Sequence, residues 1–167
     1  YRFALDAMRV LKEMNIEFSY TIIGVEEEEE LLFQRAQLDL KNEVVFEKTL
    51  PFQVVLERIK AANILLLPSL EEGIANVVLE AMALGTLVVS TNCGGMNEVI
   101  QNQENGFLVP TRNPHAIAEA IATIEALTSK EYQDIAKKAR KKIEENHTET
   151  QMIDGMLTLY KQVYEAD

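Results

Sequence analysis

The 167-residue sequence predicts a single α/β domain with a doubly wound parallel sheet and helices on both faces. Two observations carry this prediction. Short runs rich in β-branched and aromatic residues alternate with longer segments of helical periodicity, which is the order of successive βαβ units. One run, "NILLLPS" at 63–69, is apolar at consecutive positions, as expected of a parallel strand whose two faces are both covered.

The individual elements follow from local patterns. Residues 1–14 place apolar side chains at helical spacing and predict an amphipathic helix that starts at the first residue. Strands are expected at 17–24, 43–48, 63–69, 86–91 and 106–110. Helices are expected at 25–40, 51–62, 75–84, 94–102, 113–127, 129–146 and 149–165.

Several helix ends carry recognisable signals. Pro51 is expected to open a helix, and Gly85 to stop the helix that precedes it. Asn113 is expected as an N-cap, followed by Pro114 at the first helical position. The run of five glutamates at 26–30 suits the first turn of a surface helix, where acids complement the helix dipole.

Composition excludes some classes of function. A formal net charge of -11 argues against a nucleic-acid partner, because binding to nucleic acid needs a basic surface. It does not exclude a small phosphate ligand held by backbone amides. The single cysteine, Cys93, cannot form an internal disulfide, has no cationic neighbour in sequence and is expected to be structural. No apolar run reaches the length of a membrane span, so a cytoplasmic setting is expected.

The chemistry of interest lies in "LLLPSLEEGIANVVLEAMALG", residues 65–85. Asn76 is expected to cap a helix whose first amides could hold a phosphate. Glu80 lies one turn into that helix, where its carboxylate could accept two ribose hydroxyls, and Glu72 precedes the helix, where it could accept hydroxyls of a second sugar. Spacing alone favours a plainer alternative, in which both acids are solvated and merely complement the helix dipole.

A longer stretch carries a family resemblance. Residues 68–121, from "PSLEEGIANVVLEAMALG" through "NPHAIAEAI", resemble the carboxyl-terminal, donor-binding half of family 4 retaining glycosyltransferases, which have the GT-B fold. Glu72 and Glu80 have the family's spacing of two glutamates separated by seven residues, and Gly94, Gly95 and Glu98 continue the match. The resemblance implies a Rossmann-like domain and a cytoplasmic enzyme of bacterial polysaccharide biosynthesis, attached to a membrane only through the rest of a longer protein.

The resemblance also assigns roles to residues. Glu80 resembles the acid that binds the nucleotide ribose, and Glu72 the catalytic-side acid that faces the donor sugar. The backbone amides of Gly73, Ile74, Ala75 and Asn76 resemble the cradle for sugar and diphosphate. Glu71 is expected to be a solvated bystander, and residues 46–50 are a candidate region for base contacts. The implied donor is a UDP-, GDP- or ADP-sugar, with no metal and no further cofactor.

One departure from the family pattern limits what the chain is expected to do. Family members carry Gly-Arg and a nearby Lys before the first helix, and these cations neutralise the leaving diphosphate. Neither they nor an acceptor-binding domain stands in this sequence, so residues 1–167 are expected to be one domain of a longer two-domain enzyme and to be inactive alone. The alternative is a non-catalytic module, binding a nucleotide or a partner protein, that keeps the motif without the reaction.

The sheet is expected to be affected as well. The usual first, central strand of such a domain is also missing, which would leave a gap between strands 17–24 and 63–69. Either these two strands close up, or another chain fills the gap, as in a homodimer. Of the remaining features, Gly94–Gly95 is expected to form a tight turn rather than a phosphate site, and the apolar stripe at 152–159 to pack in a core or against another domain.

Overall fold

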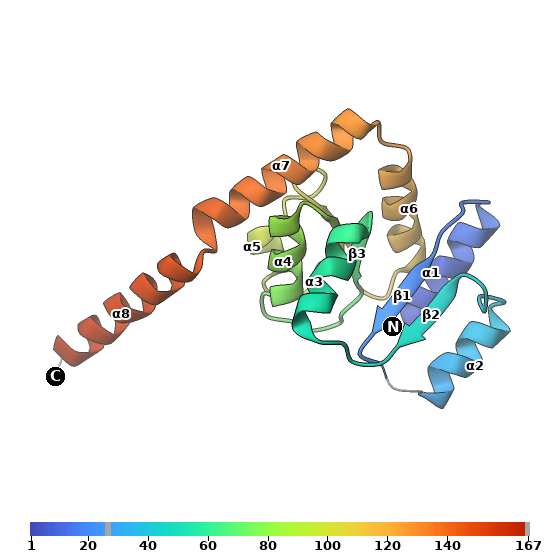
Figure 1. Cartoon of the computed structure of the whole chain (residues 1–167), viewed down its shortest axis with the longest axis horizontal. Coiled ribbons are helices and arrows are strands. Elements are labelled where there is room, and N and C mark those ends of the chain that lie inside the picture. The colour runs from blue at the N-terminus through green and yellow to red at the C-terminus, as the bar shows by residue number, and fades with distance from the viewer. Residues whose placement is uncertain (26–27, 166–167) are drawn as a thin grey trace.

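The computed structural model describes residues 1–25 and 28–165, and every expected element forms within these ranges (Figure 1). The strands are β1 (Tyr20–Ile23), β2 (Val44–Glu47), β3 (Ile64–Leu67), β4 (Leu87–Thr91) and β5 (Phe107–Val109). The helices are α1 (Arg2–Glu13), α2 (Glu29–Gln37), α3 (Phe52–Ala61), α4 (Asn76–Leu84), α5 (Met96–Val99), α6 (Pro114–Glu125), α7 (Ser129–Asn146) and α8 (Glu149–Glu165). Parallel strands flanked by helices confirm the predicted fold class.

The strands form two parallel sheets in place of one. β1 pairs with β2, aligning Tyr20 with Val44, whereas β3, β4 and β5 form a second sheet in that order. The expectation that β1 and β3 would close up is therefore wrong. The separation agrees with the gap that the missing central strand is expected to leave between these two strands. The two sheets are joined instead through their helices, because α1 packs against α6. That another chain fills the gap stays a prediction.

Strand β3 differs from the expectation in its burial. All five residues of β4 are buried, but Ile64, Leu65, Leu66 and Leu67 are each only half-buried. The consecutive apolar pattern correctly predicts a strand of a parallel sheet. The pattern overestimates how far the side chains of β3 are buried, because β3 pairs with β4 along one edge only.

The capping signals act as predicted, with one exception at α4 that is described below. The side chain of Asn113 accepts a hydrogen bond from the N–H of Ala116 at 3.0 Å, and Pro114 follows at the first position of α6. Gly85 ends α4 with φ of 85°, a left-handed conformation that glycine adopts without steric cost. Of the glutamate run, 26–27 lie outside the described residues, and 28–30 are exposed at the start of α2.

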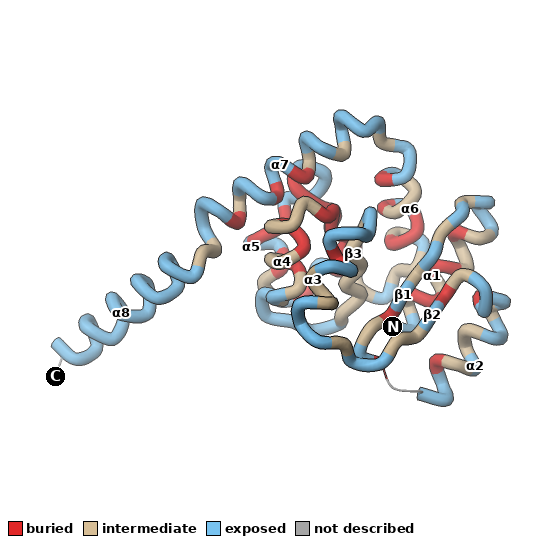
Figure 2. Tube along the Cα trace, in the orientation of Figure 1, coloured by how far each residue is buried: buried red, intermediate tan, exposed pale blue. Residues whose placement is uncertain are grey.

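The core has two parts that share the strands between them, seen as red segments in Figure 2. One part joins the β1–β2 sheet to α1 and α6 and includes Leu5, Leu11 and Ile117, all fully buried. The other lies under α3, α4, α5 and α7 and includes Met82 and Cys93. Because α1 packs against α6, the first part holds the two sheets together.

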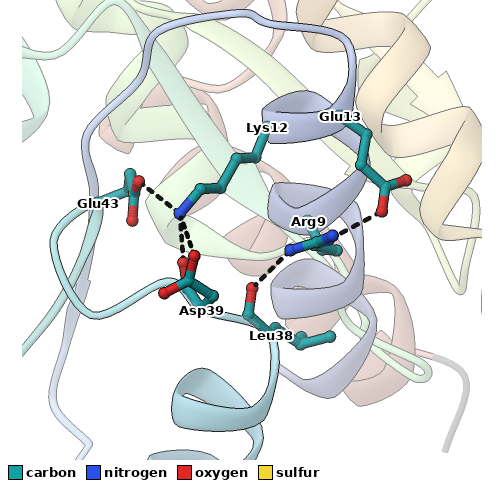
Figure 3. Close-up of polar contacts among 6 residues, drawn as sticks. All are labelled: Arg9, Lys12, Glu13, Leu38, Asp39 and Glu43. Carbon is teal, nitrogen blue, oxygen red and sulfur yellow. Dashed lines mark hydrogen bonds and ion pairs between the residues drawn. The ribbon is translucent and has the colours of Figure 1, made fainter.

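Polar contacts fasten α1 to the chain that enters β2 (Figure 3). The ammonium of Lys12 lies 2.9 Å from the Glu43 carboxylate and 3.1 Å from that of Asp39. Arg9 pairs with Glu13 on the same helix and donates to the carbonyl of Leu38. The hydrogen bond from Lys12 holds the pKa of the Glu43 carboxyl below its ordinary value.

This pairing predicts a pH-dependent contribution to stability. A carboxyl whose pKa is lowered in the folded state stabilises the protein above its unfolded pKa, and this stabilisation is lost as the pH falls through the folded value. Replacing Glu43 by Gln should therefore lower the melting temperature at pH 7 and have progressively less effect below about pH 4. Thermal unfolding followed by circular dichroism at pH 7, 5 and 3 checks this. If Glu43→Gln lowers the melting temperature by the same amount at all three pH values, the pairing of Glu43 with Lys12 does not make the predicted pH-dependent contribution.

The final helix, α8, projects away from the rest of the molecule (Figures 1 and 2). Its described residues are all exposed, including Met156, Leu159 and Tyr160. The apolar stripe at 152–159 is thus not part of the core, and its packing against another domain stays a prediction. Within the described ranges, none of the helices combines the length and apolar character needed to cross a membrane.

Candidate functional site

The loop from Pro68 to Ala75 joins β3 to α4 and carries most of the predicted site. Buried Thr91, the last residue of β4, anchors the start of this loop. Its hydroxyl is within hydrogen-bonding distance of the carbonyl oxygens of Leu67 and Ser69. The loop thus leaves the carboxyl end of β3 in a defined direction, which is the edge where parallel α/β sheets bind ligands.

The start of α4 differs from the expectation by one residue. Ala75 is the N-cap, because its backbone is extended and its carbonyl accepts from the N–H groups of Val78 and Leu79. Asn76 is the first helical residue, and its side chain makes no capping hydrogen bond. The spacing predicts the helix correctly, but a helix can also start without a side-chain cap when the preceding loop already fixes its entry.

This helix start presents a row of available donors. Among the described residues, the backbone N–H groups at 73–77 donate to no protein acceptor, and four of these five positions are the predicted cradle: Gly73, Ile74, Ala75 and Asn76. Gly73, Ile74 and Asn76 are exposed, so their amides are open to a ligand. Free amides at the positive end of a helix dipole are suited to phosphate oxygens.

The two predicted acids flank this row of amides. Glu72 is exposed and accepts a hydrogen bond from the Ser69 hydroxyl at 3.2 Å, which restrains its carboxylate on the loop. Glu80 is half-buried on α4, one turn beyond Asn76. The neighbouring acid Glu71 is exposed and makes no side-chain hydrogen bond among the described residues.

A cavity of about 750 Å³ opens beside Glu72. Its lining includes Ser69 and Glu72, together with Gly24 at the end of β1 and Thr49 and Leu50 after β2. The structure therefore brings part of the candidate base-contact region at 46–50 to the same cavity as Glu72. It does not bring Glu80 into the lining of this cavity.

The pair Gly94–Gly95 supports the loop from beneath. A Cβ atom at Gly94 would lie 1.5 Å from the carbonyl oxygen of Glu72, and one at Gly95 would lie 2.9 Å from the Ile74 side chain. The N–H of Gly95 donates to the carbonyl of Gly73 at 3.2 Å. Sequence reasoning predicts the tight turn but misses this contact, because the residues in contact lie more than twenty positions apart.

Thr91 is the other residue that sequence reasoning misses. It ends a fully buried strand, where a hydroxyl is uncommon, and that is the signal that could have found it. Replacing Thr91 by Val keeps the shape and removes the one hydroxyl donor that these two carbonyls share, which should cost about 1–2 kcal/mol of unfolding free energy. Urea denaturation measures the loss. Thr123→Val, on the exposed face of α6, is the matched control and should change stability by less than about 0.5 kcal/mol.

Comparison with known proteins decides the family. The model for glycosyl transferases group 1 matches residues 1–142. This chain belongs to that family. It is 34% identical over 148 residues to an Escherichia coli K12 protein assigned to colanic acid biosynthesis as the glycosyltransferase WcaL, and 36% identical over 122 residues to the amylovoran biosynthesis glycosyltransferase AmsK of Erwinia amylovora.

These alignments cover 84% and 69% of this chain but only 36% and 30% of the two relatives. The chain therefore spans about a third of the length of the curated glycosyltransferases that it matches. The match lies within the family's carboxyl-terminal GT-B domain, in agreement with the predicted assignment.

Solved structures show the same fold. A sucrose-phosphate synthase from Thermosynechococcus elongatus superposes with a TM-score of 0.87 at 22% identity, over 99% of this chain and 43% of that one. The Anabaena protein Alr3699/HepE, solved in complex with UDP-glucose, superposes with a TM-score of 0.75 at 24% identity, over 83% of this chain and 38% of that one. At these identities the likeness establishes the GT-B Rossmann-like fold.

Proposed function

We propose that this chain is the donor-binding domain of a retaining, metal-independent glycosyltransferase that takes a nucleotide diphosphate sugar as its donor. The observation that carries the proposal is the row of N–H groups at 73–77, which donate to no acceptor among the described residues and lie between Glu72 and Glu80 in the sequence. A diphosphate accepts hydrogen bonds from such amides, and each carboxylate accepts hydrogen bonds from sugar hydroxyls. In this assignment Glu80 holds the ribose, and Glu72 faces the sugar that is transferred.

The family and the named ligand of one structural neighbour support this proposal. Relatives that act in colanic acid and amylovoran biosynthesis favour transfer to a growing polysaccharide on the cytoplasmic side of a bacterial membrane. A UDP-sugar is the donor favoured over a GDP- or ADP-sugar, since the Anabaena neighbour was solved with UDP-glucose. The rest of the enzyme would supply the acceptor site and the cations that neutralise the leaving diphosphate.

Binding measurements on the chain as it stands test the donor site. We expect calorimetry to detect binding of one of UDP, GDP and ADP at up to millimolar concentration, unchanged by a metal chelator. Glu80→Ala should weaken that binding about 10- to 100-fold, because a hydrogen bond to a charged group contributes about 1.5–3 kcal/mol. Glu119→Ala, an exposed acid on α6, is the control and should leave binding unchanged.

Two outcomes would contradict the proposal in different ways. Absence of binding by all three nucleotides would favour a non-catalytic module that binds a partner protein. Detectable sugar transfer by the isolated chain would instead show that the groups needed for turnover all lie within residues 1–167.

A further inference from the structure

The carboxylate of Glu72 has a specific partner on its own loop, the hydroxyl of Ser69. This hydroxyl donates to Oε1 of the carboxylate at 3.2 Å and makes no other side-chain hydrogen bond among the described residues. Ser69 is half-buried and Glu72 is exposed. The contact therefore joins the start of the loop, next to β3, to the acid that the proposed function assigns to the transferred sugar.

The main chain of the loop is held without this hydroxyl. The hydroxyl of buried Thr91 lies within hydrogen-bonding distance of the carbonyl oxygen of Ser69. On the other side, the N–H of Gly95 donates to the carbonyl of Gly73 at 3.2 Å, directly after Glu72. The backbone is thus fixed at both ends of the stretch that joins the two side chains, so the Ser69 hydroxyl is not needed to hold it.

What the Ser69 hydroxyl can fix is the direction of the Glu72 side chain. The last torsion of a glutamate is broad, so a carboxylate without a partner samples many orientations. A hydroxyl on Oε1 selects among these orientations and leaves Oε2 available to accept from a ligand. The carboxylate is therefore oriented before a ligand arrives, which reduces the entropy lost on binding.

The neighbouring acid provides a contrast within the same loop. Glu71 is exposed, as Glu72 is, but its side chain makes no hydrogen bond among the described residues. Two adjacent carboxylates thus differ in the one contact that Ser69 supplies. Solvation alone would not require this contact, whereas recognition of a ligand benefits from it.

We propose that Ser69 is a positioning residue for Glu72. Its hydroxyl orients the carboxylate toward the sugar of the donor, and it thereby contributes to recognition of that sugar but not of the nucleotide. The identity of the ligand rests on the proposed function, whereas the orientation of Glu72 can be measured without any ligand.

The variant Ser69→Ala tests the orientation first. Because the loop backbone keeps its other contacts, the melting temperature should change by less than about 2 °C. NMR relaxation of side-chain carbons should show that Glu72 becomes as mobile as Glu71. Ser69→Thr keeps the hydroxyl and should leave Glu72 ordered. The control Ser129→Ala, at an exposed serine that starts α7, should leave the mobility of Glu72 unchanged.

Titration of the same variants with UDP and UDP-glucose, followed by NMR, tests the recognition. Ser69→Ala should weaken binding of UDP-glucose about 3- to 10-fold, the range expected for one hydrogen bond, and should change binding of UDP by less than about twofold. Ser69→Thr should retain both affinities. A purely structural role would instead alter the two affinities together.

Three outcomes would overturn the proposal, each at a different step. Unchanged relaxation of Glu72 in Ser69→Ala would show that Ser69 does not orient this side chain. A more mobile Glu72 with equal changes in the affinities for UDP and UDP-glucose would remove the role in sugar recognition. If the unsubstituted chain binds neither ligand, the proposed donor is wrong, and the role in sugar recognition is wrong with it, whatever the relaxation shows.

Discussion

Replacing Gly94 by Ala should displace the loop that carries Glu72 and lower the free energy of unfolding by at least about 2 kcal/mol. Two effects combine at this position. Gly94 has φ of 53°, which costs a non-glycine residue about 1–2 kcal/mol, and the added Cβ would lie 1.5 Å from the Glu72 carbonyl oxygen. Backbone atoms cannot move aside as a flexible side chain can, so the loop itself must shift.

The matched control for Gly94→Ala is Gly85→Ala. Gly85 also has a positive φ, 85°, but a Cβ there would meet nothing within 4 Å. This control should cost about 1 kcal/mol and leave the loop in place. Urea denaturation gives the stabilities, and chemical shifts of the amides at 72–74 report the loop. Equal losses in both variants, with unchanged loop shifts, would show that Gly94 does not support the loop.

Replacing Leu5 by Ala should destabilise the protein by about 2–5 kcal/mol, because the side chain is fully buried and leaves a cavity. Leu5 belongs to the core that α1 and α6 share, and this core joins two sheets that are not hydrogen-bonded to each other. Loss of packing at Leu5 should therefore let the β1–β2 sheet unfold more readily than the β3–β4–β5 sheet. Hydrogen exchange should therefore show amides of β1 and β2 opening at lower free energy than those of β4.

Leu159→Ala makes the same chemical change on the exposed surface of α8, where the side chain is 58% exposed. It should alter stability by less than about 0.5 kcal/mol. If the Leu5 variant instead lowers the protection of all five strands equally, the two sheets unfold as one unit and the joining role of α1 and α6 is wrong.

Periodicity predicts the order and type of the elements, because the spacing of apolar residues differs between helices and strands, and caps such as Asn113 depend on neighbouring residues alone. The residues of the site loop could also be placed, since Glu72 and Glu80 stand at fixed distances from a strand end and a helix. What pattern could not give are the contacts across the fold. The position of Gly94 beneath Glu72 and the contact of Thr91 with the end of β3 depend on how distant segments pack. The sequence suggested a gap between β1 and β3 but could not decide whether the two strands would close it.

The helix α8 also determines the size of the molecule in solution. A compact chain of this length has a radius of gyration of about 15 Å, whereas α8 with its 17 residues is a rod of about 25 Å. X-ray scattering would therefore see an elongated particle whose mass lies mostly at one end. The helix α8 also exposes the apolar side chains of Met152, Leu159 and Tyr164. In concentrated solution, molecules of this chain should therefore self-associate through α8 unless another surface covers it.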